Sequence, residues 1–331
     1  MTGRRIGIGV IGAGAMGAYH VNALAGSVPG AEVVAVHDAD WERAGHVAAA
    51  CGATVMESVE ALLGDVRVEA VLVASPDPTH AEMVLACLAA EKSVLCEKPL
   101  ATDPDDARRV IDAEIAGGRK RVQVGFMRRY DPGFTELKAT LDSGAIGAPR
   151  VVHCVHRNRS PYPGITATAI VRNSMIHELD VLRWILGAEI TSIDVQTGTS
   201  VDPQGPQLAT IRIGEVLASI EVSVNARYGY DVRCEVVGDC GTATLLAPSA
   251  VRTQIAGVDA VPIVPGFVAR FGAAYLAQLR DWVEGVRTGT VRGPTAWDGF
   301  MAELVAGSAV EALGTGVRQQ VWSPERPALY A

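Results

Sequence analysis

A glycine-rich turn between an apolar strand and a helix is the feature that most constrains this chain. Residues 12–17 read Gly-Ala-Gly-Ala-Met-Gly and directly follow the apolar run Ile6 to Ile11. In that context Gly12 permits a tight turn, Gly14 lets the backbone approach a pyrophosphate at the helix N-terminus, and Gly17 lets the helix sit close to the strand. The pattern predicts a dinucleotide site rather than a merely tight strand-to-helix turn.

Alternating strand and helix patterns extend this interpretation over the first part of the chain. Short Val- and Ile-rich runs alternate with longer Ala-rich segments, which indicates βαβ units and a parallel sheet. The sequence therefore predicts a doubly wound Rossmann domain over residues 1–125. Strands are expected at 6–11, 32–38, 68–74, 93–96 and 121–125, and helices at 16–25, 41–51, 79–90 and 104–117.

The sequence pattern changes from about Gly144 onward. Alternating, β-branched segments separated by Gly, Pro, Asp and Asn indicate a mainly antiparallel sheet with one open face. The chain is therefore expected to be α/β, with an α+β second domain over residues 126–331. The strand patterns lie at 150–157, 191–198, 208–213, 216–226 and 231–237, and helices are expected around 174–186, 267–287 and 294–313.

Composition narrows the class of partner. The 331 residues carry 29 Lys and Arg against 37 Asp and Glu, a formal charge of −8 without a basic stretch, so nucleic acid is not an expected partner. The longest apolar stretch, 83–90, is far shorter than the roughly 20 residues that cross a bilayer, and no signal peptide is recognisable, so we expect a cytoplasmic protein with no membrane partner. Six cysteines without a Cys-x-x-Cys pair, and histidines without ligand spacing, predict no metal site.

An acidic residue at the end of the second strand indicates the cofactor. Asp38 lies 21 positions beyond Gly17, where a carboxylate hydrogen-bonds the ribose hydroxyls of the adenosine half and repels a 2′-phosphate. NAD is therefore favoured over NADP, although Arg43 leaves some room for NADP. Alternatively, Asp38 only begins a turn.

Two loops follow the carboxyl ends of central strands, where open parallel sheets bind their ligands. Ser75-Pro76-Asp77-Pro78-Thr79-His80 is expected beside the nicotinamide half, whether or not Thr79 also caps the next helix. Glu97-Lys98-Pro99 follows the next strand, and a lysine fixed there could hydrogen-bond a substrate hydroxyl and stabilise a developing alkoxide. The alternative is a solvated lysine at a strand end.

A histidine in the second half supplies a candidate base. Asn173, Ser174 and His177 are spaced to share one helix face or its entrance. A neutral imidazole is suited to take a hydroxyl proton while hydride moves to a nicotinamide. The spacing alone equally fits a buried structural histidine, and Asp180, one turn further on, could orient the ring or lie in solvent.

The motifs together resemble a known family. Residues 12–17, Glu97-Lys98-Pro99 and His177-Glu178-Leu179-Asp180 look like those of the Gfo/Idh/MocA oxidoreductases, and segments 122–131, 153–158, 228–231 and 293–299 are similar to those of bacterial inositol 2-dehydrogenases. The likeness runs essentially end to end. It implies NAD-linked oxidation of a ring hydroxyl of myo-inositol to an inosose by a homotetramer, and a cis Lys98-Pro99 peptide. The open β face also favours oligomerisation, because apolar residues there need covering.

The resemblance also implies roles for individual residues. Lys98 and His177 would act in proton transfer, with Asn173 as the third catalytic position. Without the resemblance, the pocket positions are more typical of packing, ion pairs or turns than of a binding site. The cofactor site is expected to comprise Gly12, Gly14, Ala15, Met16, Gly17, Asp38, Ser75, Pro76, His80, Glu97 and Lys98. The polyol or cyclitol substrate would be lined by Met127, Arg128, His156, Asn158, Asn173, Ser174, Tyr228 and Tyr230.

One position departs from the family pattern. Inositol dehydrogenases carry an aspartate four residues before the catalytic histidine, where this chain has Asn173. An amide cannot hold the negative charge that would stabilise an imidazolium or a charged lysine. The sequence thus leaves open a weaker inositol dehydrogenase, an enzyme for another cyclitol, aminocyclitol or sugar, and a non-catalytic protein that binds NAD and polyol. An NAD-retaining glycosidase or lyase is a further alternative that no residue specifically favours.

Overall fold

The computed structural model describes residues 4–162, 164–198, 205–246 and 251–331, and its contacts divide the chain into two compact units. Unit 1 comprises Met1–Phe126, Tyr275–Glu303 and Glu325–Ala331. Unit 2 comprises Met127–Ala274 and Leu304–Pro324. The sequence suggested one boundary near residue 125. The units differ from that division because residues 275–303 and 325–331 return to unit 1.

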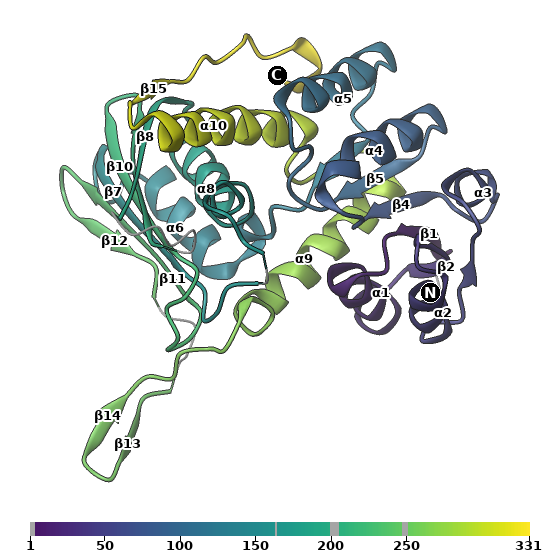
Figure 1. Cartoon of the computed structure of the whole chain (residues 1–331), viewed down its shortest axis with the longest axis horizontal. Helices are drawn as coiled ribbons and strands as arrows, with labels where there is room; N and C mark the ends of the chain where they lie inside the picture. Colours follow the sequence, from purple (N-terminus) through teal and green to yellow (C-terminus); the bar gives the residue numbers. More distant parts are fainter. Residues whose placement is uncertain (1–3, 163, 199–204, 247–250) are drawn as a thin grey trace. The chain divides into compact units, whose positions relative to one another are not determined.

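Unit 1 is built on a six-stranded sheet in the order β3-β2-β1-β4-β5-β6 (Figure 1). All five neighbouring pairs are parallel, and the order runs outward in both directions from β1, so the predicted doubly wound plan is confirmed. The strands are β1 (Ile6–Ile11), β2 (Ala31–His37), β3 (Thr54–Val55), β4 (Ala70–Val73), β5 (Ser93–Cys96) and β6 (Val122–Val124), and the helices between them are α1 (Ala15–Ser27), α2 (Trp41–Ala49), α3 (Val59–Gly64), α4 (His80–Ala89) and α5 (Pro104–Ala116).

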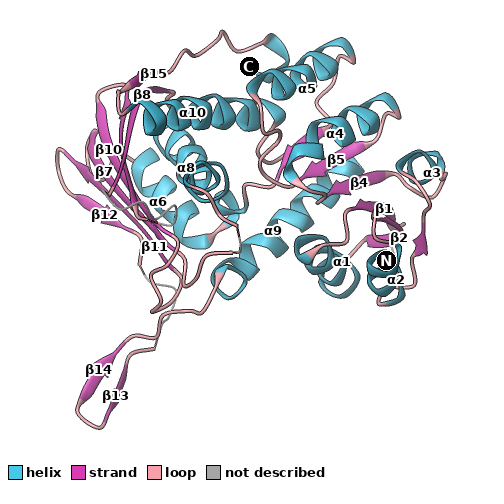
Figure 2. Ribbon diagram, viewed as in Figure 1, coloured by secondary structure: helices cyan, strands magenta, loops and turns pink. Residues whose placement is uncertain are grey.

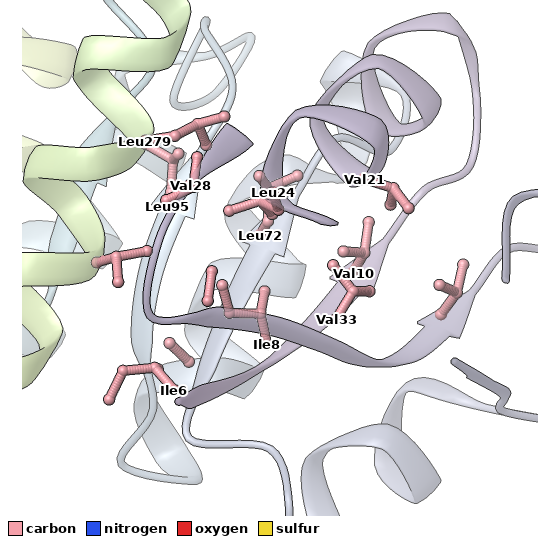
Figure 3. Packing of buried hydrophobic residues seen from close by; sticks show 14 of the residues in the cluster. Ile6, Ile8, Val10, Val21, Leu24, Val28, Val33, Leu72, Leu95 and Leu279 are labelled. Carbon is pink, nitrogen blue, oxygen red and sulfur yellow. The ribbon is translucent and has the colours of Figure 1, made fainter. Parts of the chain in front are cut away.

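Strand β1 lies in the apolar core of unit 1. All six residues of β1 are buried, as expected for a parallel strand covered on both faces. Ile8 and Val10 of this strand belong to one apolar cluster with Leu24 of α1 (Figure 3). Leu279, from the C-terminal part of the chain, belongs to the same cluster. This packing fixes the sheet whose carboxyl edge carries the predicted cofactor loops.

The last residues of the chain are held to unit 1 by a buried carboxyl group. The Tyr330 hydroxyl donates to Glu114 Oε2 at 2.5 Å, and Glu114 Oε1 accepts the backbone N–H groups of Arg121 and Val122. Burial raises the pKa of Glu114 above its ordinary value, against the effect of these donors. The contact explains why residues 325–331 group with the first half of the sequence.

Unit 2 carries a seven-stranded mixed sheet in the order β12-β11-β7-β10-β9-β8-β15. Among its described pairs β7 and β10 run parallel and the rest are antiparallel, which confirms the predicted mainly antiparallel sheet. Helices α6 and α8 lie on one face of this sheet (Figure 2). The strands are β7 (Pro149–Arg157), β8 (Ile190–Thr197), β9 (Gln207–Ile213), β10 (Val216–Ser223), β11 (Asp231–Gly238), β12 (Thr242–Thr244) and β15 (Gln319–Gln320), and the helices are α6 (Pro132–Asp142), α7 (Ala167–Ile170) and α8 (Ile176–Leu186).

The two closing helices are present as predicted, as α9 (Phe267–Thr288) and α10 (Ala296–Thr315), and the division into units falls within each of them. A short hairpin of β13 (Thr253–Ile255) and β14 (Val258–Ala260) precedes α9. Across the described parts of the chain, none of the helices combines the length and hydropathy that a bilayer crossing needs.

Candidate active site

The glycine turn of unit 1 has the geometry that each of its three glycines was expected to supply. Gly12 adopts φ +99°, and a Cβ there would lie 2.4 Å from the carbonyl oxygen of Ala74. A Cβ on Gly17 would lie 1.9 Å from the carbonyl oxygen of Gly12, so the helix approaches the turn too closely for any side chain. Space is open above Gly14, immediately before α1. The turn therefore fits a pyrophosphate at the N-terminus of a helix.

Asp38 lies beside this turn. Its Oδ2 accepts the backbone N–H of Ala13 at 2.7 Å, and its Oδ1 accepts Arg43 Nη2 at 2.7 Å and the N–H of Asp40 at 2.8 Å. Partial burial acts to raise the pKa of Asp38, but the hydrogen bonds from Arg43 and the two backbone groups hold it below its ordinary value. Asp38 therefore presents an ionised carboxylate where adenosine ribose hydroxyls bind in Rossmann folds. The guanidinium of Arg43 is therefore paired with the Asp38 carboxylate.

The loop after β4 is tied together by its own side chains. Ser75 Oγ and Thr79 Oγ1 lie 2.7 Å apart, and the Thr79 hydroxyl donates to the carbonyl of Pro76 at 2.7 Å. Thr79 occupies the N-cap position of α4, but its side chain makes no capping bond there, because the hydroxyl is turned back to Pro76. His80, the first residue of α4, is buried between the carbonyls of Ser75 and Pro99.

The loop after β5 presents Lys98 between two buried neighbours. Glu97 and Pro99 are buried, and Lys98 is partly exposed. The Lys98-Pro99 peptide is cis. Glu97 accepts hydrogen bonds from His20 and from the backbone N–H of Lys98. The carboxyl ends of β1, β2, β4 and β5 thus bring the predicted cofactor residues of unit 1 to one edge of the sheet.

In unit 2 the candidate base follows a break in helical regularity. Residues Val171–Met175 form a π-helical turn, in which the N–H of Ile176 donates to the carbonyl of Val171. Asn173 and Ser174 lie in this turn, and His177 lies in the first turn of α8. The π geometry is often found at functional sites, and its wider turn still brings residues four apart to one side of the helix. Ser174 and His177 are both buried.

His156 of β7 lies beside His177. Their ring centroids are 6.3 Å apart, and the His156 ring meets Tyr230 edge-on at 5.6 Å. The Tyr230 hydroxyl is 3.3 Å from His156 Nε2. The structure thus gathers three of the predicted residues: His156 from strand β7, His177 from helix α8 and Tyr230 from the loop directly before β11.

A buried ion pair lies behind His156. Arg128 Nη1 donates to Glu178 Oε1, and both side chains are about 1% exposed. His156 Nδ1 lies 3.1 Å from Glu178 Oε2 and 3.2 Å from Arg128 Nη2. Nδ1 can donate to the carboxylate or accept from the guanidinium, and that choice decides whether Nε2 carries a lone pair or a hydrogen toward Tyr230.

Burial and charge act in opposite directions on this cluster. Desolvation would raise the pKa of Glu178, but the charge of Arg128 and the bonds from Arg128 and His156 hold it below its ordinary value. Burial raises the pKa of the Tyr230 phenol. Tyr230 is therefore a neutral hydroxyl that can donate or accept, beside an ionised carboxylate paired with a guanidinium.

The remaining predicted residues divide between the interior and the surface. Met127 is buried, and the side-chain oxygen of Asn158 is buried without a hydrogen-bond partner among the described residues. Tyr228 is 48% exposed, and its hydroxyl donates to Asp231 at 2.7 Å. Of the two tyrosines proposed for the pocket, Tyr230 is therefore the one that joins His156.

The sequence did not indicate the role of Glu178, and of the two alternatives open for Asp180 the structure excludes a solvent-exposed side chain. The Glu178 partners Arg128 and His156 lie 50 and 22 positions away, so no local pattern indicates that Glu178 joins them. Asp180 does not lie in solvent: it is 1% exposed and accepts two hydrogen bonds from Arg129. Within the described ranges, no group of three or more His, Cys, Asp or Glu side chains is placed to hold a metal ion.

A doubly wound sheet, a glycine turn open to a pyrophosphate and a carboxylate beside it define the class of protein, a Rossmann-type oxidoreductase. Residues 6–126 match the model of an oxidoreductase family with an NAD-binding Rossmann fold, and residues 134–244 match the Gfo/Idh/MocA C-terminal domain. The chain belongs to the Gfo/Idh/MocA family.

Similar proteins cover the whole chain. Inositol 2-dehydrogenase 1 of Saccharopolyspora erythraea is 44% identical over 98% of both chains, and inositol 2-dehydrogenase of Pseudomonas fluorescens is 43% identical over 98% of this chain and 99% of its own. The crystal structure of myo-inositol dehydrogenase from Lactobacillus casei, in complex with NAD(H) and myo-inositol, superposes with a TM-score of 0.95 at 34% identity, covering 99% of this chain and all of that one.

Proposed function

We propose that this protein oxidises a ring hydroxyl of a cyclitol to a ketone with NAD as the oxidant, and that myo-inositol is the first candidate substrate. The observation that carries the proposal is the pairing of His177 with His156 and Tyr230 in one buried cluster directly after a π-helical turn. The names and ligands of the similar proteins support the substrate class.

Unit 1 is proposed as the cofactor-binding unit, in line with a cofactor domain over residues 1–125. Bound NAD supplies an acceptor for the hydride of the carbinol carbon. Gly12 and Gly17 would allow the tight turn and the close approach of the helix, and the backbone N–H groups of Gly14, Ala15 and Met16 at the start of α1 would hold the pyrophosphate. Asp38 binds the ribose and disfavours a 2′-phosphate. The loop after β4, with Ser75, Pro76 and His80, and the loop after β5, with Glu97 and Lys98, would complete the cofactor site.

Two side chains are proposed to act in the proton transfer, one as the base and one as a hydrogen-bond donor to the reacting oxygen. His177 accepts the hydroxyl proton as hydride leaves carbon, and becomes imidazolium. The Lys98 ammonium donates a hydrogen bond to the same oxygen and stabilises its developing negative charge. Asn173 lies four residues before His177 and is proposed as the third catalytic position, where it can orient but not carry charge.

The polar residues of unit 2, within residues 126–331, are proposed to bind the ring. His156, Tyr230 and Ser174 offer hydrogen bonds, and the buried side-chain oxygen of Asn158 is an acceptor suited to a hydroxyl. A site that hydrogen-bonds several hydroxyls rejects analogues that lack them. Arg128 would act through His156 and Glu178, the buried Met127 would add an apolar lining, and Tyr228 would contribute from the exposed side.

Asn173 favours a second candidate within the same class of reaction. Without a carboxylate at this position, the chain could be a dehydrogenase for a different cyclitol, an aminocyclitol or a sugar. Specificity depends on the pocket contacts, so the candidates separate by relative kcat/KM across a panel of these compounds.

Assembly and location are also proposals. The open face of the seven-stranded sheet exposes Leu208 and Leu217, 49% and 43% accessible, on neighbouring strands β9 and β10. Covering such residues in a homotetramer removes apolar surface from water. We propose a cytoplasmic homotetramer, and light scattering that gives a monomer at low concentration contradicts the assembly.

The activity is tested by NADH formation. Purified protein is assayed with NAD or NADP and myo-inositol, its stereoisomers, aminocyclitols and common aldoses at mildly alkaline pH. We expect NADH formation with at least one cyclitol and higher kcat/KM with NAD than with NADP. No turnover with any of these compounds overturns the proposal. Binding of NAD and polyol without turnover would indicate a non-catalytic protein, and conversion of a glycoside without net NADH a glycosidase or lyase.

A further inference from the structure

Two histidines of unit 1 are almost completely buried, and the proposed reaction uses neither as its acid or base. His20 lies in α1, which directly follows the glycine turn, and is 0% exposed. His80 begins α4, directly after the loop that follows β4, and is 1% exposed. Both contact the loop Glu97–Pro99 that carries Lys98, one on each side of the lysine.

His20 holds the residue before Lys98. Its Nε2 lies 2.6 Å from Glu97 Oε1, and the second carboxylate oxygen, Oε2, accepts the backbone N–H of Lys98 at 3.2 Å. Burial would raise the pKa of Glu97, but the hydrogen bond and charge of His20, with the charge and N–H of Lys98, hold it below its ordinary value. An ionised carboxylate buried at this position requires such partners.

The surroundings leave this pair little freedom. A Cβ on Gly125 would lie 2.9 Å from Glu97 Oε2, so the carboxylate fills the space over that glycine. The His20 ring meets Tyr19 edge-on at 5.7 Å and Tyr275 at 5.8 Å. The imidazole and the carboxylate are therefore confined by close packing as well as by their hydrogen bond.

His80 holds the residue after Lys98. Its Nδ1 lies 2.6 Å from the carbonyl oxygen of Pro99, and its Nε2 lies 2.8 Å from that of Ser75. Both partners are acceptors, so a neutral ring can donate to one carbonyl and an imidazolium to both. The ring therefore ties the loop after β5 to the loop after β4.

We propose that His20 and His80 are positioning residues that clamp the Glu97–Pro99 loop from both sides and thereby set the direction of Lys98. The buried neighbours of the lysine are each held by a histidine, and Lys98 between them is the partly exposed residue. The helix after the dinucleotide turn and the loop beside it are thus linked through two imidazoles to the proton-transfer lysine. The inference rests on the proposed function in that it concerns the catalytic role of Lys98.

The kinetic test compares variants that remove the donors with variants that keep them. His20→Leu and His80→Phe remove the ring nitrogens, and His20→Gln and His80→Gln retain an N–H donor. We expect kcat for cyclitol oxidation to fall about tenfold or more in the first pair, because a misplacement of about 1 Å can cost about 10²-fold. The primary isotope effect with substrate deuterated at the reacting carbon should rise, while the dissociation constant for NADH stays within about twofold in His20→Leu, which removes no proposed cofactor contact. The Gln variants should recover most of kcat.

The control is His46→Leu. His46 is an exposed histidine of α2 whose ring also bonds a backbone carbonyl, that of Glu42 at 2.8 Å, without contact to the loop. It should leave kcat unchanged. A purely structural role predicts lower thermal stability in the Leu and Phe variants with unchanged kcat and isotope effect, and that result overturns the proposal.

A second measurement does not depend on turnover. The chain has four lysines, 92, 98, 120 and 138, so ¹³C-dimethylation gives few lysine signals, and Lys98→Arg assigns the one of interest. We expect His20→Gln and His80→Gln to keep the wild-type Lys98 signal. His20→Leu and His80→Phe, or Gly125→Ala if those variants do not fold, should shift or broaden it and leave Lys120 and Lys138 unchanged. An unchanged Lys98 signal in the folded variants overturns the clamp, whereas absence of cyclitol turnover in wild type overturns only the proposed function.

Discussion

His156 Nδ1 lies 3.1 Å from Glu178 Oε2, so a strand histidine of the proposed substrate site is oriented by a carboxylate that is itself neutralised by Arg128. Glu178 and Arg128 are 50 positions apart in sequence and are both about 1% exposed. Such a pair contributes little net stability relative to an apolar pair, but losing one partner leaves the other charge buried alone. Because both members of the pair lie within hydrogen-bond distance of His156 Nδ1, the pair orients that ring.

Glu178→Gln should therefore be strongly destabilising. The substitution keeps the shape of the side chain but leaves the Arg128 cation without its counter-charge, which costs about 3–5 kcal/mol when a buried pair is broken. Chemical denaturation monitored by circular dichroism measures the change. Asp239→Asn removes one partner of an exposed pair with Arg150 and should change stability little. Equal stability of the Glu178 variant and wild type would show that the pair does not act as described.

The same carboxylate predicts an acid-dependent loss of stability. Because the pKa of folded Glu178 lies below its ordinary value of 4.5, the unfolded state binds more protons than the folded state between the two values. Its stabilising effect is complete above the ordinary pKa and is lost as pH falls through the folded value. Glu97, whose pKa is also lowered, acts in the same direction. The melting temperature should decline below about pH 4.5, less steeply for Glu178→Gln. A parallel decline in both proteins argues against this carboxylate as a cause.

His177→Gln and Lys98→Met should each abolish most activity. Removing a positioned acid or base costs about 10²–10⁴-fold in rate. NADH binding, measured by fluorescence, should persist in His177→Gln, because His177 is not among the proposed cofactor contacts. If both residues act on one proton transfer, the double variant loses much less than the product of the two single losses. A kcat within about twofold of wild type in either single variant removes that residue from the mechanism.

Asn173→Asp should raise the rate of myo-inositol oxidation. The added negative charge would stabilise the imidazolium that forms on His177, and about 1.4 kcal/mol of such stabilisation is worth about tenfold in rate. Steady-state kcat at several pH values checks this. Asn225→Asp adds the same charge at an exposed position of unit 2 and serves as the control. No change, or a fall, would show that proton removal is not limited at position 173, and would favour a different natural substrate.

Much of unit 1 was predictable because its strands are continuous apolar runs separated by helix signals. β1, buried at all six positions, and the glycine turn after it place the cofactor edge without any knowledge of distant contacts. Helix α6 could also have been predicted from the sequence. Asp131 caps it by accepting the N–H of Phe134, and Pro132 occupies its first turn, which is a recognisable start signal.

Other features depend on contacts between residues far apart in sequence. The pairing of Arg128 with Glu178, and the return of Tyr330 to Glu114, join residues 50 and 216 positions apart, and no local pattern encodes such distances. The π-helical turn at 171–175 carries no known sequence signal either, since it differs from an α-helical turn by one hydrogen-bond step. The role of His20 could not be predicted from the sequence either, because it depends on the hydrogen bond between its ring and Glu97.

Cofactor choice follows from the contact between Asp38 and Arg43 at 2.7 Å. In wild type the carboxylate occupies the guanidinium and would repel a 2′-phosphate, so we expect a preference for NAD. Asp38→Ser removes the repulsion and releases Arg43 to pair with the phosphate, so the ratio of kcat/KM for NADP to that for NAD should rise by about tenfold or more, since about 1.4 kcal/mol separates tenfold differences. Asp38→Ser combined with Arg43→Gln should lose much of this gain, because the guanidinium would be absent. If the double variant prefers NADP as strongly as Asp38→Ser alone, then Arg43 does not reach the 2′ position and relief of repulsion alone explains the shift.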